Sequence, residues 1–235
     1  MTAPASPGST TDLPSRLAAV RGRIRAACER AGRDPTEVTL VGVSKTHPPA
    51  VARAAVAAGL ADLGENRAQE LAPKAEALTA EGVQPRWHFI GHLQRNKVRD
   101  VLPHIAALHS VASERLVDEV ERRFERRDAP GPLPCYIEVN VAGETSKEGI
   151  PPSEVEVLLR RASASTALRV EGLMTVAPRV SRPEEVRPVF RALRELAAAH
   201  GLAGLSMGMT DDFEVAIEEG ATVVRVGRAI FGERQ

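Results

Sequence analysis

The sequence predicts an α/β fold: a single TIM-type (β/α)8 barrel with an extra N-terminal helix. Short apolar runs rich in β-branched residues alternate with helical stretches, which is typical of a parallel sheet. About eight such runs in a chain of 235 residues suit one barrel. A doubly wound sheet is the alternative. It usually carries a glycine-rich loop after its first strand, whereas here Ser44-Lys45-Thr46-His47-Pro48 follows that strand.

The N-terminal part of the chain divides into a tail and a helix. Residues 1–11 are rich in Ala, Pro, Ser, Thr and Gly, lack the charged start and apolar stretch of a signal peptide, and predict a disordered tail. A helix is expected from Asp12, a good capping residue, with apolar residues at three- and four-residue steps until Gly32 ends it. We expect residues 12–235 to form one domain.

The remaining elements follow in alternation. The expected strands are residues 38–43, 61–64, 86–90, 105–109, 133–139, 168–173, 204–206 and 222–226. The expected helices are residues 49–58, 67–80, 96–102, 113–127, 153–165, 183–200 and 211–219. Three helices begin at good N-cap residues, namely Ser113, Ser153 and Asp211. Three end at a glycine, namely Gly59, Gly201 and Gly220.

The composition excludes several classes of protein. Lys plus Arg and Asp plus Glu both number 31, and aromatic residues make up 3%, so neither a basic surface nor a base-stacking platform for nucleic acid is indicated. No apolar run approaches the ~18 residues that a membrane span needs. Cys28 and Cys135 fall in apolar patterns and are expected to be buried thiols in a reducing cytoplasm.

Polar residues follow nearly every expected strand, and in a barrel these positions share the face that holds active sites. Lys45 comes first. Because it follows Val41 and Val43 at a period of two, it should point into the barrel, although a solvated lysine is the alternative. An inward amine with a lowered pKa is suited to Schiff-base chemistry.

His88 and His92 lie four residues apart, but across a strand and its turn, so we expect no metal site. His88 and Trp87 are expected to line or support the barrel interior.

The loops after the last two strands have the features of a phosphate site. Ser206 and Thr210 supply hydroxyls, and Gly208 between them allows close backbone approach to an anion. Gly227 and Arg228 follow the eighth strand, and barrels commonly bind phosphate with these two loops. A simple turn capped by Asp211 is the alternative. An amine suited to Schiff-base chemistry, Lys45, together with a phosphate site suggests pyridoxal 5′-phosphate (PLP) as the ligand.

Longer segments resemble the YggS/PROSC-type PLP homeostasis proteins, whose barrel is similar to the N-terminal domain of alanine racemase. The matching segments include Val41-Gly42-Val43-Ser44-Lys45-Thr46, Gly64-Glu65-Asn66-Arg67, Trp87-His88-Phe89-Ile90-Gly91-His92, Glu138-Val139-Asn140, Ser146-Lys147-Glu148-Gly149, Gly172-Leu173-Met174-Thr175, Ser206-Met207-Gly208-Met209-Thr210-Asp211-Asp212-Phe213 and Val224-Arg225-Val226-Gly227-Arg228. They run in order from about residue 38 to the C-terminal end of the chain.

The resemblance implies a role for each residue of the site. Lys45 would hold PLP as a Schiff base, Asn66 would lie near the ring, and Arg225 would face the pyridine nitrogen. The phosphate would be held by Ser206, by the loop Gly208, Met209 and Thr210, and by the backbone of Gly227 and Arg228. Many relatives carry threonine where this chain has Arg228. If the phosphate contact is through the backbone N–H, arginine serves equally and its guanidinium adds a second phosphate contact, whereas a side-chain hydroxyl contact would be lost.

These expectations favour a PLP carrier or regulator without robust turnover. Arg225 would keep the ring nitrogen unprotonated. The second base of alanine racemases, a tyrosine of an added β domain, is missing, since the single tyrosine, Tyr136, lies inside an expected strand. A small amino-acid racemase and a class I aldolase-like barrel are the alternatives. Lys147 is either an acceptor during PLP transfer or an exposed loop lysine. We expect apo PLP-dependent enzymes as partners and a monomer.

Overall fold

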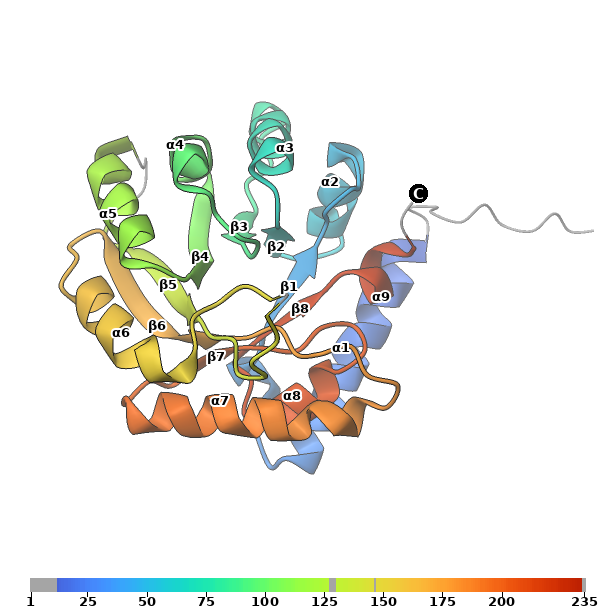
Figure 1. Ribbon diagram of the computed structural model, residues 1–235. Coiled ribbons are helices and arrows are strands. Elements are labelled where there is room, and N and C mark those ends of the chain that lie inside the picture. Colours follow the sequence, from blue (N-terminus) through green and yellow to red (C-terminus); the bar gives the residue numbers. More distant parts are fainter. Residues whose placement is uncertain (1–11, 127–129, 146, 234–235) are drawn as a thin grey trace, which may run out of the picture.

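The computed structural model describes residues 12–126, 130–145 and 147–233, so the predicted tail 1–11 lies outside the described residues. Within them, eight parallel strands close into a barrel in chain order, from β1 to β8, with β1 also paired to β8 (Figure 1). Helices surround the strands. The predicted single (β/α)8 barrel with an extra N-terminal helix is confirmed.

Each predicted strand is present, with its ends shifted by at most two residues. The strands are β1 Thr39–Val43, β2 Asp62–Glu65, β3 Arg86–Phe89, β4 Ile105–Val111, β5 Leu133–Glu138, β6 Leu168–Met174, β7 Gly204–Ser206 and β8 Val223–Val226. The α-helices are α1 Leu13–Arg30, α2 Pro49–Ala57, α3 Ala68–Ala80, α4 Val98–Val101, α5 Glu114–Arg123, α6 Val155–Ser163, α7 Arg187–Ala199, α8 Phe213–Glu218 and α9 Arg228–Phe231. Short 3-10 turns precede α4, α6 and α7.

The N-terminal helix α1 completes the ring of helices. The helix after β8, α9, has only four residues and is too short to cover its strand. Helix α1 packs against α8, α9 and α2, so it occupies the place between the last and the first βα units (Figure 1). Its buried side is the predicted apolar stripe, from Leu13 through Leu17 and Val20 to Ile24.

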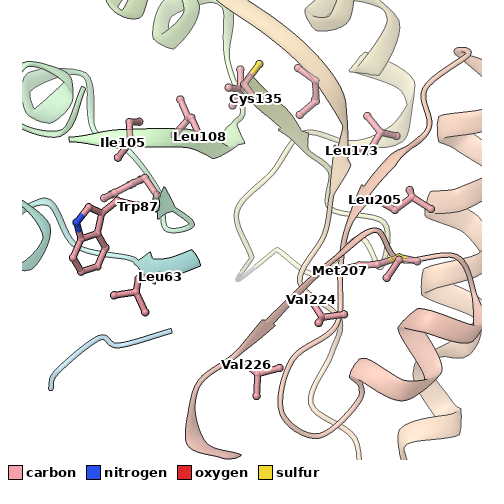
Figure 2. Packing of buried hydrophobic residues seen from close by; sticks show 14 of the residues in the cluster. Leu63, Trp87, Ile105, Leu108, Cys135, Leu173, Leu205, Met207, Val224 and Val226 are labelled. Carbon is pink, nitrogen blue, oxygen red and sulfur yellow. The ribbon is translucent and has the colours of Figure 1, made fainter. Parts of the chain in front are cut away.

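The main hydrophobic core lies between the strands and the helices. The outward-facing strand residues fill it, among them Leu63, Leu108, Leu173 and Val224 (Figure 2). Trp87 belongs to this outer layer, so of the two predicted roles, lining or supporting the barrel interior, the first is wrong for this residue. It alternates with His88, which takes the inward position and contacts His109. The interior holds a small apolar cluster, Val41, Tyr136, Met174 and Val223, and several polar side chains, among them His109, Ser206 and Arg225.

The helix caps only partly follow the prediction. Ser113 Oγ accepts the N–H of Leu116 at 3.2 Å, as expected for an N-cap. Asp12 occupies the N-cap of α1 without a side-chain cap bond, and Ser153 lies inside a 3-10 turn. Asp211 is not the cap of α8, because the N-cap residue is Asp212. The glycines at 59, 201 and 220 have positive φ and end their helices as predicted.

Two further expectations concern thiols and membranes. Cys28 and Cys135 are both free and buried, as predicted. In the described ranges, none of the helices has both the length and the apolar character to cross a bilayer.

Candidate functional site

The turn after β1 presents Lys45 and is held from behind by a buried ion pair. Lys74 Nζ, on α3, lies 2.5 Å from Glu65 Oε1 and donates to the carbonyl of Ser44 at 3.0 Å. The Ser44 hydroxyl donates to the same Glu65 oxygen at 2.7 Å. Lys74 is 4% exposed and Glu65 is fully buried, so the end of β1 is fixed on its outer side.

The residue after Lys45 has an unusual backbone. Thr46 has φ +67°, a left-handed conformation that costs a β-branched residue free energy. Its N–H donates to Glu70 Oε2 on α3 at 2.6 Å, which stabilises the turn. Helix α3 therefore restrains the chain on both sides of Lys45.

Lys45 lines a pocket together with two of the predicted phosphate residues. The pocket has a volume of about 310 Å³, and Val43, Gly227 and Arg228 contribute to its wall. Arg179, from the loop after β6, adds another cation to it. The structure thus brings the start and the end of the barrel together, because β1 pairs with β8.

The loop after β7 has a strict need for glycine at one position. Gly208 has φ +92°, and a Cβ there would lie 2.6 Å from the Cβ of Ala216 and 2.9 Å from Phe213 Cα. Its carbonyl accepts the backbone N–H of Arg225 at 3.0 Å. Glycine is therefore required by the backbone conformation and by the packing of α8 against the loop.

The neighbours of Gly208 connect the two predicted phosphate loops. Met209 donates its N–H to Asp212 Oδ1 at 2.6 Å, so this donor is already used inside the loop. Thr210 Oγ1 accepts the N–H of Ala229, after β8, at 3.5 Å. The Arg228 guanidinium pairs with Asp211, with one N–O distance of 2.6 Å. These contacts join the loop after β7 to the loop after β8, so Thr210 and Arg228 belong to neighbouring loops.

Arg225 and Ser206 lie in the barrel interior. Arg225 Nη1 donates to Ser206 Oγ at 2.6 Å, and Nη2 donates to the carbonyl of Thr175 at 2.8 Å. Arg225 is 4% exposed and Ser206 is fully buried. Burial lowers the pKa of Arg225 to about 10, against the opposing effect of Glu138 and Asp212, so the guanidinium stays charged at neutral pH.

A chain of polar side chains continues from Ser206 across the barrel. His109 Nδ1 lies 2.7 Å from Ser206 Oγ, and His109 Nε2 lies 2.9 Å from His88 Nδ1. His88 Nε2 lies 3.0 Å from Asp62 Oδ1. Exposed Arg86 donates two hydrogen bonds to the Asp62 carboxylate, at 2.7 and 2.6 Å.

Burial and neighbouring charges set the protonation of this chain. Burial, with smaller effects from His88 and Arg225, holds the pKa of His109 well below its usual value, so its ring is neutral. Burial raises the pKa of Asp62, but hydrogen bonds from His88 and Arg86 outweigh it and leave that pKa below the ordinary value. Asp62 is therefore a carboxylate.

The single tyrosine also belongs to the interior. The ring of Tyr136 stacks on that of His109, with centroids 4.6 Å apart. Burial is the main cause that raises the pKa of Tyr136 to about 12. The phenol is therefore protonated and poorly suited to act as a base at neutral pH.

Several buried polar atoms near the carboxyl ends of β2, β4 and β5 have no hydrogen-bond partner among the described residues. They are Asn66 Oδ1, Ser110 Oγ, Glu138 Oε2 and Asn140 Oδ1. Native proteins rarely leave buried polar atoms unpaired, and those that do often bind a polar ligand or water there. Asn66, a predicted site residue, is one of them, so this rim of the barrel fits a ligand with polar groups.

The other sequence candidates, Lys147 and His92, do not line the pocket of Lys45. Lys147 Nζ, in the loop after β5, donates to the carbonyl of Val176 at 3.1 Å and lies 3.2 Å from Glu144 Oε1. His92 pairs with Glu148 at 3.2 Å, whereas His88 belongs to the interior chain, so the two histidines have different partners. 

Sequence reasoning missed the roles of His109 and Asp62. The signal that was available is a polar residue at an inward position of an otherwise apolar strand. Both positions fit it, since His109 alternates with buried Leu108 and Asp62 with buried Leu63.

Comparison with known proteins decides the family. The family model "Alanine racemase, N-terminal domain" matches residues 15–235. The pyridoxal phosphate homeostasis protein of Aquifex aeolicus is 45% identical over 226 residues, which cover 94% of this chain and 97% of the relative. The chain belongs to the family of pyridoxal phosphate homeostasis proteins. The human homeostasis protein is 36% identical, over 93% of this chain and 85% of its own length.

Solved structures agree with this family. The structure of PipY from Synechococcus elongatus, with PLP bound, has a TM-score of 0.80 and 32% identity. The match covers the whole PipY chain and 94% of this chain. Alanine racemase from Corynebacterium glutamicum is 20% identical with a TM-score of 0.62, which shows the shared fold only.

Proposed function

We propose that the protein binds PLP and serves in its homeostasis, with Lys45 holding the cofactor as a Schiff base. The observation that carries the proposal is the position of Lys45, in one pocket with Gly227 and Arg228. Its amine would condense with the aldehyde of PLP and release water. A relative of similar size, PipY, has been solved with PLP bound.

The remaining predicted residues would bind the rest of the cofactor. Gly227 and Arg228 would supply backbone N–H groups to the phosphate, next to the Thr210 hydroxyl. The N–H of Met209 and the hydroxyl of Ser206 already have partners within the fold, so we assign these two residues to shaping the loop and orienting Arg225. The side chain of Arg228 would have to share its charge between Asp211 and the phosphate.

The ring would lie between Asn66 and Arg225. Asn66 Oδ1 is buried without a partner among the described residues, which leaves an acceptor for a cofactor hydroxyl. Arg225 remains cationic and is fixed by Ser206 and Thr175, so it would donate a hydrogen bond to the pyridine nitrogen and keep it unprotonated. A PLP ring with an unprotonated nitrogen is a weaker electron sink, which supports a protein that carries PLP rather than one that uses it for catalysis.

Absorbance and mass spectrometry test the covalent link. The purified protein, incubated with PLP, should be yellow and be bleached by borohydride, and the reduced adduct should map to Lys45. Lys45→Ala should abolish the band, whereas the matched control Lys97→Ala, which removes an amine paired with Asp100 at 3.8 Å, should leave it unchanged. An adduct on another lysine would refute the assignment.

We further propose that the protein carries PLP without robust turnover. Tyr136 is buried against His109 and has a pKa of about 12, so it would not supply a second base for racemisation. Incubation of the loaded protein with L-alanine in deuterated buffer should give negligible exchange of the α-proton. Appreciable exchange, with formation of D-alanine, would favour the racemase.

Delivery to apo PLP-dependent enzymes is the partner function that follows. Lys147 lies in the loop after β5 with its amine bound to Glu144 and Val176, which supports either a transfer role or a loop-fixing role. The rate at which the loaded protein activates an apo enzyme should fall in Lys147→Ala if it accepts PLP. An unchanged rate would remove the idea. We expect a monomer in solution, and light scattering after gel filtration measures this directly.

A further inference from the structure

The polar chain across the barrel interior ends at the residue that would face the cofactor ring. It joins five side chains from β2, β3, β4, β7 and β8, namely Asp62, His88, His109, Ser206 and Arg225. We propose that His109 is a positioning residue for PLP: it holds the Ser206 hydroxyl as the acceptor for Arg225 and thereby fixes the guanidinium. The inference deepens the proposed function and rests on it for the cofactor.

The direction of each hydrogen bond follows from the ends of the chain. Arg225 has donors only, so Ser206 Oγ must accept from it. Asp62 is a carboxylate, so His88 must donate to it from Nε2. The two ends therefore fix a donor at one side and an acceptor at the other, and the two histidine rings must be arranged between them.

A single arrangement satisfies every group with both rings neutral. His88 carries its proton on Nε2, so its Nδ1 accepts from His109 Nε2–H. The Nδ1 atom of His109 is then unprotonated and accepts a hydrogen bond from the Ser206 hydroxyl. All the donors point from Arg225 toward Asp62. The opposite tautomer of His109 would place a proton between itself and Ser206, so His88 would have to donate from both nitrogens and carry a charge.

The interior around His88 and His109 disfavours the alternative in which His88 is charged. His109 is fully buried, its ring stacks on Tyr136, and the Arg225 cation lies on the other side of Ser206. A charge on His88 would add a second cation to an interior that already holds Arg225, and the Asp62 carboxylate beside His88 is already paired with Arg86. The Nε2–H tautomer of a neutral His109 is therefore the state that the geometry supports.

The orientation of Arg225 depends on this tautomer. Its guanidinium donates to Ser206 Oγ and to the Thr175 carbonyl, and only the first of these acceptors can rotate. When the Ser206 hydroxyl donates its hydrogen bond to His109 Nδ1, a lone pair of Ser206 Oγ is directed at Arg225 Nη1. Without an acceptor at His109, the hydroxyl proton must find another partner, and the serine rotamer that serves Arg225 is no longer selected.

Paired substitutions at His109 separate positioning from simple packing. His109→Leu removes the acceptor and keeps the apolar bulk, whereas His109→Asn places a carbonyl oxygen close to the position of Nδ1. The matched control is His104→Leu, because His104 is a partly exposed histidine whose Nε2 lies 4.0 Å from Glu76 Oε1. Thermal melts of the unloaded variants establish that each one folds.

Three readouts test the proposal. In ¹⁵N NMR of the unloaded wild-type protein, the His109 ring should show a protonated Nε2 and a bare Nδ1. For PLP, the Kd of His109→Leu should rise about tenfold, equivalent to about 1.4 kcal/mol, and its absorption maximum should move. His109→Asn should stay within about twofold of the wild type with an unmoved maximum, as should the control.

Several outcomes would overturn the inference. A protonated Nδ1 in wild-type His109 would refute the tautomer, and this measurement needs no PLP and no variant. Equal loss of affinity in the Leu and Asn variants would reduce His109 to a packing role, and no loss in either would remove any role. Failure of the proposed function looks different, because then Lys45 gives no adduct while the NMR pattern of His109 persists.

Discussion

Glu138 gives the sharpest test of the electrostatics at the mouth of the barrel. This carboxyl group ends β5, is 6% exposed, and has an Oε2 atom without a partner among the described residues. Burial raises its pKa from 4.5 to about 7, although the Arg225 cation opposes the shift. The perturbation is Glu138→Gln, which keeps the shape and removes the titration.

The sign of the effect follows from proton linkage. Between pH 4.5 and 7 the folded protein holds a proton on Glu138 that the unfolded chain has lost, so the free energy of unfolding falls as the pH rises through this window. A difference of 2.5 between the two pKa values corresponds to about 3 kcal/mol. Glu138 therefore costs the unloaded protein stability at pH 8 and little at pH 4.

Urea denaturation of the unloaded protein at pH 4.5, 6 and 8 measures this dependence. We expect Glu138→Gln to gain stability relative to the wild type as the pH rises, by about 3 kcal/mol in all. Glu156→Gln, on the exposed surface of α6, is the matched control and should show no such gain. A Glu138→Gln difference that is the same at every pH would show that the carboxyl group has an ordinary pKa, and the reasoning about its burial would fail.

Three other substitutions test the fold around the site by urea denaturation. Lys74→Met removes the ion-pair partner of the buried Glu65 and should lower the free energy of unfolding by about 3–5 kcal/mol. A second substitution, Glu65→Leu, should restore part of this loss. Additive losses in the double variant would contradict the pairing. Gly208→Ala meets Ala216 at φ +92° and should cost at least about 1–3 kcal/mol, so a neutral result would disprove the strained turn. Leu108→Ala in the outer core should cost about 2–5 kcal/mol, and a smaller loss would indicate that the cavity collapses.

Local sequence patterns were enough to place the strands and the barrel. Apolar runs such as 105–109 and 204–206 are bounded by turn residues, and alternation along each strand separates the inward from the outward side. The helix starts were harder, because a cap depends on how the preceding loop enters the helix. Asp211 and Asp212 are adjacent acidic residues, and only the fold shows that the second one accepts the N–H of Met209.

The site was predictable where one loop carries the chemistry, as at Lys45 and Gly208. It was not predictable where the function depends on residues from distant strands. His109 and Ser206 are 97 positions apart and meet only because the closed barrel turns the inward side chains of β4 and β7 toward each other. Lys74 is a similar case: on a helix surface its charge suggests solvent, whereas the packing of α3 buries it against Glu65.

The placement of α1 has a consequence for how the chain folds while it is being synthesised. Helix α1 is synthesised before α8 and α9, on which it packs, and β1 before β8, with which it pairs, so these two segments acquire part of their neighbours late. Nascent chains that have emerged only through β7 expose the apolar stripe of α1 and one free edge of β1. Such chains should recruit chaperones, and release of the segment that forms α8, β8 and α9 should end that dependence.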